Sequence, residues 1–544
     1  MAPLATRIAR WTWPLLVGAA CSDATLPASP DEPPPGAQDV ADPPAATVTP
    51  LRRLTRAQYQ NTIAAALGDA LDPALDVAAA LPLDDQAGGF AANTVPATDI
   101  VVEQYERLAE RISASLRPGP TLDCWSAGAD ATCGPTPVAD LAATLYRRPL
   151  DDAEVARLHA LRAETGVRGM VTALLIAPDF LYRVEGGQWL SPGLDRIALD
   201  GPSIAARMAF LLWAAPPDEA LRNAAGDLTS PEARQAQLER MLADPRSRAG
   251  LARMHLQWLQ LERLSHLVKD RNVFPNFSEA VGAQMIAEVE RFVDMVVRHG
   301  DGTLATLLTS RRTLAQPGVV FWYGDDATIE LEDPPPDAPE GARVLTLDPE
   351  HRAGLLTLVS VLAAHAKPDL SDPIRRGAMI RERLLCQPLL AAPPDVPPAP
   401  AAPDPGASVR EQLEQHRADP SCAVCHDLAD PIGFALESYD AMGRFRTEDA
   451  AGNAIDDRGE VVQSDLEGPL QGGVALATAL SGSEQVQRCY ATQWFRYAYG
   501  RLEDPDDRTE LAALQDGFVS SGGHIPSLLT ALVTSEAFVH RRLP

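Results

Sequence analysis

The chain of 544 residues is longer than one hydrophobic core supports, because single cores stop growing at about 250–300 residues. Apolar residues make up 46% and charged residues 22%, which is typical of globular proteins, so we expect several packed units. The formal net charge of −27 would be repelled by nucleic acid phosphates and anionic lipid surfaces, so we expect no nucleic acid partner.

The first twenty residues have the order of an export signal. Arg7 and Arg10 precede a short apolar run, and small residues lead directly to Cys21. This order predicts export, and the position of Cys21 resembles the lipidated cysteine of bacterial lipoproteins. An ordinary cleaved signal with an incidental Cys21 is the alternative. We therefore expect a protein of the cell envelope, periplasmic or at the outer surface, attached to the membrane by an N-terminal lipid and without an internal membrane span.

Two proline-rich runs divide the chain. Residues 21–50 and 388–408 are rich in Pro and Ala and nearly free of large apolar side chains, so neither can bury a core. The predicted segments are an export signal of lipoprotein type over 1–20, a tether over 21–50, helical domains over 51–115, 116–190 and 191–332, a helical lead-in over 333–387, a linker over 388–408, a cysteine-containing segment over 409–475 and a C-terminal helical domain over 476–544.

Helical periodicity dominates between these runs. Over 278–299, apolar residues such as Val281, Met285 and Val289 recur at steps of three and four, which predicts an amphipathic helix. Similar patterns predict helices over 204–214, 235–242, 251–264, 354–365, 486–499 and 527–540. Strand signals are confined to 319–323 and to 452–462, which could form a small ribbon. The expected fold class is mainly α, with several helical domains in series and a minor β ribbon.

A compact cysteine and histidine cluster follows the second proline-rich run. Cys422 and Cys425 are three residues apart, and His426 comes directly after them. In a helical turn the two sulfurs share one face, where they can add to the vinyl groups of haem, while the histidine turns toward the iron. The spacing C-x-x-C-H is the signature of c-type haem attachment.

Other chemistries use the same cysteine pair. A structural zinc site needs a second pair at similar spacing, which the other cysteines do not supply. A redox dithiol remains open, although such a pair usually opens a helix after a strand. A plain disulfide is the third alternative. The sequence favours one haem c with iron, and export agrees with it because c-type attachment occurs outside the cytoplasm.

The run HRADPSCAVCHDLADPIGFALESYDAMGRFR, residues 416–446, resembles the haem-motif segment of the planctomycete-type cytochrome c proteins. These are exported bacterial proteins built from several domains of unknown function. Further runs resemble other segments of that family in the expected order: 52–63 with 81–90, 145–158 with 173–185, 206–221 with 241–247, 352–386, and 489–501 with 532–541. The resemblance implies haem on Cys422 and Cys425, with His426 as the proximal iron ligand, in a small cytochrome-c-like segment over 409–475. It names no substrate.

The second axial ligand decides between electron carrier and enzyme, because carriers use Met or His there and catalytic haems leave the position open. Met442 and His416 are the nearest candidates, and His365 and Met379 are more distant ones. A packing role is the favoured interpretation of Met442. His416 is the better candidate ligand, with a surface or capping role as its alternative.

The other cysteines are candidates for disulfides in an oxidising compartment. Cys124 and Cys133 are close in sequence, which predicts a local bond. Cys386 and Cys489 could then pair and tie the haem segment to the last domain. Four cysteines permit three connectivities, and a buried free thiol at Cys489 is an alternative.

The favoured function is one-electron transfer at the cell envelope by an exported c-type haem protein, with a redox partner protein. A haem-dependent oxidoreductase acting on peroxide, oxygen or an extracellular substrate is the alternative, since nearly 350 residues precede the haem segment. A surface binding module with an accessory haem is the third. The sequence predicts neither catalytic residues nor the oligomeric state.

Overall fold

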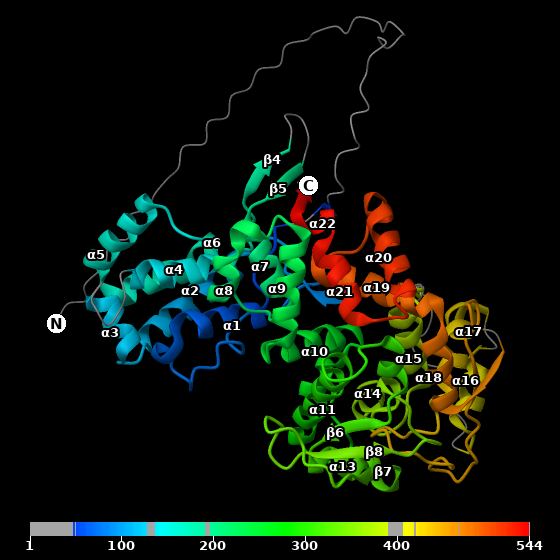
Figure 1. Cartoon of the computed structure of the whole chain (residues 1–544). Coiled ribbons are helices and arrows are strands. Elements are labelled where there is room, and N and C mark those ends of the chain that lie inside the picture. The colour runs from blue at the N-terminus through cyan, green and yellow to red at the C-terminus, as the bar shows by residue number, and fades with distance from the viewer. Residues whose placement is uncertain are drawn as a thin grey trace, which may run out of the picture. The chain divides into compact units, whose positions relative to one another are not determined.

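Helices build most of the chain in the computed structural model, which describes residues 47–48, 51–127, 136–190, 196–389, 406–417, 420–466 and 468–542. The predicted mainly α fold class with minor β structure is confirmed (Figure 1). The export signal, Cys21, Cys133 and most of the predicted linker lie outside the described residues. Within the described ranges, no helix has both the length and the apolar character needed to cross a membrane.

The first helical group follows β1 (Thr47–Val48) and begins at strong N-caps. Thr55 caps α1 and Asp151 caps α5, each in a reciprocal capping box with the side chain three residues later. Helix α5 is kinked at Gly166, whose φ is 71°. The elements are α1 (Arg56–Leu67), η1 (Gly68–Ala70), β2 (Gln86–Ala87), β3 (Phe90–Ala91), α2 (Asp99–Ala114), α3 (Pro120–Ala127), α4 (Pro137–Tyr146), α5 (Asp152–Ile176) and α6 (Pro178–Leu181).

The second group contains the helix predicted over 278–299, which is α11 (Glu279–Val297) with its apolar face buried. The helix predicted over 251–264 is instead α10 followed by η3, because Gln260 takes a positive φ of 54° between them. The other elements are β4 (Gly187–Trp189), β5 (Arg196–Leu199), α7 (Gly201–Leu212), α8 (Glu219–Asn223), η2 (Ala225–Asp227), α9 (Pro231–Ala243), α10 (Arg246–Trp258), η3 (Leu261–His266) and α12 (Leu304–Thr309).

The strand predicted over 319–323 is wrong, because this segment belongs to helix α13 (Pro317–Tyr323). Pro317 occupies the first helical turn, where its fixed φ favours a helix. Val319, Trp322 and Tyr323 are the buried residues, at the spacing of one helical face. Burial of that face outweighs the strand preference of valine and aromatic side chains.

Short strands pair mostly with distant segments. Strands β6 (Arg312–Ala315), β8 (Arg343–Leu347) and β7 (Ala327–Ile329) form an antiparallel sheet in that order. A second sheet has the order β1-β11-β5-β4 and pairs β1 in parallel with β11 (His540–Arg542), so the two ends of the described chain meet there. Strand β9 (Arg458–Glu460) lies in the predicted ribbon, but its partner β10 (Pro469–Gln471) comes from beyond it.

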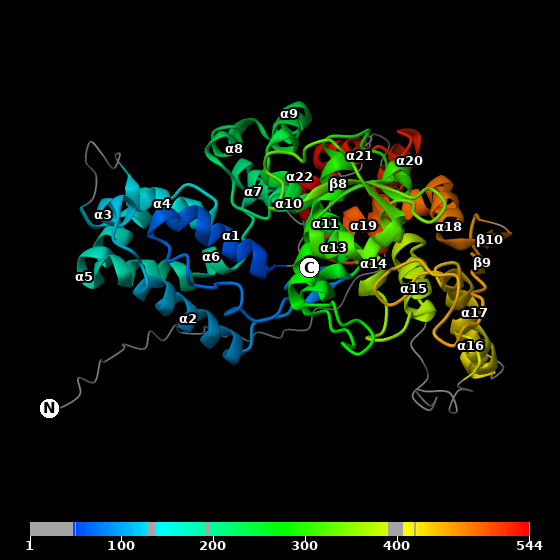
Figure 2. The same cartoon turned by 90° about the horizontal axis from the view of Figure 1, so that it is seen from below.

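The last part of the chain contains the cysteine motif and the C-terminal helices (Figure 2). The helix predicted over 486–499 is α19, whereas the pattern over 527–540 divides into α21, α22 and β11. The elements are η4 (Gly324–Asp326), η5 (Leu355–Thr357), α14 (Val359–Ala364), α15 (Pro373–Met379), the π-helix η6 (Ile380–Leu384), α16 (Val409–Arg417), α17 (Pro420–Phe434), α18 (Gly472–Gly482), α19 (Glu484–Tyr499), η7 (Pro505–Asp507), α20 (Arg508–Ser520), α21 (Ile525–Thr534) and α22 (Glu536–Val539).

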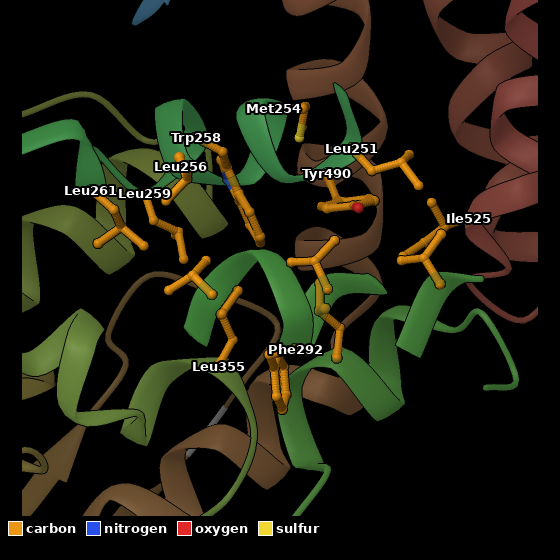
Figure 3. Packing of buried hydrophobic residues seen from close by; sticks show 14 of the residues in the cluster. Leu251, Met254, Leu256, Trp258, Leu259, Leu261, Phe292, Leu355, Tyr490 and Ile525 are labelled. Atoms are coloured by element: carbon orange, nitrogen blue, oxygen red, sulfur yellow. The ribbon is translucent and has the colours of Figure 1, made fainter. Parts of the chain in front are cut away.

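Two large hydrophobic cores organise these elements. One is built from residues between Leu54 and Phe180 together with Phe210, so the predicted segments 51–115 and 116–190 share it. The other runs from Ile197 to Val539 and includes Phe90. Figure 3 shows part of the second core, where side chains of α10, α11, α19 and α21 meet. The segment with the cysteine motif packs onto this second core and has no large core of its own among the described residues.

Candidate functional site

Helix α17 carries the whole C-x-x-C-H motif in two consecutive helical turns. Cys422 is buried, with 8% of its surface exposed, and Cys425 is half-buried. His426 follows on the same helix, and 17% of its side chain is exposed. The two cysteines therefore have the helical i and i+3 relation that attachment to a flat ring requires, close to the protein surface.

His426 is oriented by a residue that sequence reasoning missed, Asp430. The Nδ1 atom of His426 lies 3.0 and 3.1 Å from the two carboxylate oxygens of Asp430, which is fully buried one turn later. A carboxylate can only accept, so Nδ1 donates its proton, and the hydrogen bond raises the pKa of His426. In the neutral ring Nε2 then carries the lone pair. The sequence signal was the i, i+4 spacing of His426 and Asp430, which puts the two side chains on one face when the segment is helical.

Helix α17 is packed against α15 at two glycines. An added Cβ atom on Gly377 would lie 1.9 Å from the carbonyl oxygen of Ala429, and one on Gly433 would lie 1.9 Å from that of Pro373. Backbone therefore touches backbone at both points, and no side chain fits between the helices. This close approach fixes the position of the motif helix relative to the second core.

Two buried basic side chains donate hydrogen bonds to the backbone that follows α17. Arg376 donates from Nη1 to the carbonyl oxygens of Leu436 and Tyr439, both at 2.8 Å. Lys269 donates from Nζ to the carbonyl oxygen of Ala441 at 2.6 Å, and burial lowers the pKa of this lysine to about 7. These bonds satisfy carbonyl groups that neither a helix nor a sheet uses. The turn after the motif helix is thereby held by α15 and by the segment between η3 and α11.

The candidate axial ligands have different positions. Met442 is fully buried in the second core, which agrees with a packing role. His416 belongs to α16, but its side chain lies outside what the structure describes. His365 is fully buried with Nε2 at 2.7 Å from the carbonyl oxygen of Leu259, and burial lowers its pKa to about 3. Met379 is also buried in the second core.

No three His, Cys, Asp or Glu side chains gather around a common point in the described ranges. Such a group is what a metal ion bound by side chains alone requires. A haem iron needs only one or two protein ligands, because the ring supplies the others.

Disulfides occur away from the motif. Cys386 and Cys489 are joined, with their Cα atoms 5.4 Å apart, which ties the end of η6 to α19. Cys124 is also disulfide-bonded, and Cys133 lies outside the described residues. Cys386 and Cys489 are the pair that the sequence suggested as the second disulfide. Because Cys489 is in this bond, it is not a free thiol.

Four family models match successive parts of the chain. Each is described as a protein of unknown function: DUF1587 over residues 52–117, DUF1592 over 199–324, DUF1588 over 352–449 and DUF1585 over 468–538. None of the four covers the resembling run at 145–185, and the C-x-x-C-H motif falls within the third match. No curated protein matches the chain, and no solved structure does. The chain thus carries in series four domains of unknown function of the planctomycete cytochrome c type.

Proposed function

We propose that this chain binds one haem c, attached to Cys422 and Cys425 with His426 as the proximal ligand, and passes single electrons at the cell envelope. The observation that carries the proposal is the Asp430 carboxylate behind His426, at 3.0 Å from Nδ1. Metal-bound histidines almost always donate their second ring N–H to such a partner. The residues present therefore fit a haem iron.

Each residue has a defined task in this proposal. The sulfurs of Cys422 and Cys425 would form thioether bonds, and Nε2 of His426 would bind the iron. Asp430 keeps the proton on Nδ1 and orients the ring. When bound, haem supplies a centre that cycles between ferrous and ferric iron. A redox partner protein would dock near the half-buried face of α17, and lipid on Cys21 would attach the protein to a membrane.

The attachment is tested by replacing both cysteines, Cys422→Ala with Cys425→Ala, in a host with c-type haem maturation. The wild-type protein should give a c-type pyridine haemochrome and keep its haem through acid–acetone extraction. The double variant should lose covalent haem completely, since no thioether can form. Covalent haem in the double variant, or its absence from the wild type, would contradict the proposal.

A second experiment tests Asp430 through the reduction potential of the haem. Asp430→Asn keeps an acceptor for Nδ1 but removes a buried negative charge that favours ferric iron. The reduction potential should therefore rise by roughly 60 mV, which is a tenfold change in the equilibrium constant of the one-electron reduction. Asp427→Asn is the matched control on the same helix, because Asp427 is exposed and paired with Arg417 at 2.6 Å. Equal shifts in the two variants would show that Asp430 does not act through His426.

A haem-dependent oxidoreductase is the second candidate, because residues Leu54 to Phe180 build a separate core that an electron carrier does not need. Carbon monoxide distinguishes the two functions. Rapid binding to the ferrous protein would indicate an open sixth position and favour the oxidoreductase, whereas an unchanged spectrum would favour the carrier.

A further inference from the structure

Four arginine side chains converge on a buried cavity that is remote in sequence from the C-x-x-C-H motif. The cavity has a volume of about 30 Å³, and Arg52, Arg183, Arg207 and Arg253 contribute to its wall. They come from the segment before α1, the segment after α6, α7 and α10. Tyr497 of α19 completes one side. No Asp or Glu of the described chain is among the lining residues.

One of the four arginines is neutralised. Arg207 donates from Nε and Nη2 to the two carboxylate oxygens of Glu185, at 2.6 and 2.8 Å, and from Nη1 to the carbonyl oxygen of Phe538 at 2.7 Å. Burial raises the pKa of Glu185, but the charge of Arg207 outweighs it and the pKa falls to about 2. The charge of Glu185 also acts on Arg52 and Arg183, and Arg541 lies 3.9 Å from it, so this one carboxylate offsets only part of the positive charge around the cavity.

The other three arginines have no ion-pair partner in the part of the chain that the structure describes, where no carboxylate oxygen lies within 4.0 Å of their guanidinium groups. Arg52 donates only a long bond of 3.4 Å to the carbonyl oxygen of Ala498, and Arg183 lies over the ring of Phe210 at 5.1 Å. The Nη1 atom of Arg253 is buried without any hydrogen-bond partner.

Burying cations in this way is costly, because each guanidinium loses its water and repels the others. Burial and the charge of Arg183 lower the pKa of Arg52, and burial lowers the pKa of Arg183 to about 10. The charge of Arg253 acts to lower the pKa values of Asp84 and Glu290, but neither of these acids lines the cavity. The wall therefore has an excess of positive charge and a donor that points at no acceptor.

We infer that this cavity binds one compact oxyanion, such as phosphate or sulfate. Guanidinium groups present planar forks of N–H donors that match the oxygens of these anions. By the same measure, a cavity needs about 10–15 Å³ to contain one water molecule, so 30 Å³ leaves room for a compact ion. The proposal does not rest on haem binding.

The anion would also join parts of the chain that different family models match. Arg52 lies in the match over 52–117, Arg253 in that over 199–324, and Tyr497 in that over 468–538. Arg183 comes from a segment that none of the four models covers. One bound ion would offset the charges of the arginines and lie beside Tyr497, so it should stabilise the packing of these parts as well as occupy the site.

The test is calorimetric titration of the full haem-loaded protein with phosphate or sulfate, at an ionic strength kept constant with sodium chloride. We expect one ion to bind per chain and the unfolding temperature to rise by about 2 °C or more at saturation. Arg253→Met should weaken binding at least about tenfold. Arg107→Met, which removes an exposed arginine paired with Glu103, is the matched control and should bind as the wild type does.

Three outcomes would overturn the inference. They are no heat of binding with either oxyanion, an equal effect of chloride, and unchanged affinity in Arg253→Met. If Arg253→Met does not fold, Arg183→Met provides the same comparison, because its guanidinium lines the same cavity without an ion pair in the described chain. Failure of haem attachment would leave the result unaffected, since titration of the Cys422→Ala, Cys425→Ala protein reports on the cavity alone.

Discussion

A single methyl group added at Gly377 or Gly433 is expected to separate α17 from α15 and to destabilise the motif segment by more than about 3 kcal/mol. The added carbon would meet a backbone carbonyl oxygen at 1.9 Å in either case. A backbone atom cannot rotate away as a side chain can, so one helix must move. Movement of α17 would also break the packing that positions the C-x-x-C-H motif.

Urea unfolding measures this loss of stability. The fraction of chains that carry the proposed covalent haem is measured on the same variants. Gly517→Ala in α20 is the matched control, because no atom lies within 4 Å of the added carbon. That change should stabilise its helix by up to about 1 kcal/mol, as expected for Gly→Ala in a helix interior. Wild-type stability in Gly377→Ala and Gly433→Ala would mean that the two helices do not touch through their backbones.

The second large effect concerns Glu288, which should make the protein less stable as the pH rises through 7. Its carboxyl group is almost fully buried in α11, and Tyr323 donates to Oε1 at 2.6 Å while Ser360 donates to Oε2. Burial raises the pKa of Glu288 to about 7. The network joins α11 and α13 to α14, and therefore two of the matched segments.

The sign of the pH dependence follows from proton binding. The folded protein keeps the Glu288 proton up to about pH 7, whereas the unfolded chain loses it near the ordinary value of about 4.3. The stabilisation is fully present below the unfolded value and is lost as the pH rises through the folded value. The loss is on the order of 3 kcal/mol at pH 8.

Glu288→Gln should remove this dependence, since glutamine has the shape of the protonated acid and cannot ionise. Its urea-unfolding free energy should match the wild type near pH 4.5 and exceed it above pH 7. Glu279→Gln on the same helix is the control, because Glu279 is exposed. Parallel curves for wild type and Glu288→Gln between pH 4.5 and 8.5 would contradict the pKa assigned to Glu288.

The sequence predicted those features that depend on neighbouring residues. The amphipathic α11 and the C-x-x-C-H cluster are local patterns, and the structure contains both as helices. The segment 319–323 was assigned wrongly, because valine and aromatic residues fit a strand and a buried helical face equally well. Asp430 was visible at i+4 from His426, but only its burial shows that it orients the ring.

Features built from distant segments could not be predicted. Arg52 and Arg253 are far apart in sequence, and nothing local indicates that both line one cavity. Gly377 and Gly433 look like ordinary helix-weakening residues until the other helix is placed against them. The core that segments 51–115 and 116–190 share could not be predicted either, because tertiary contacts decide which helices pack together.

The bond between Cys386 and Cys489 makes the intervening chain a covalent ring with a tail at each end. Both cysteines of the C-x-x-C-H motif lie inside that ring, at 422 and 425. The proline-rich run lies inside it too, so one backbone cut there would open the ring without separating the two halves of the molecule. Under the proposed haem attachment, maturation would have to oxidise the outer cysteine pair while the inner pair stays reduced for thioether formation, which places two opposite redox demands within a single loop.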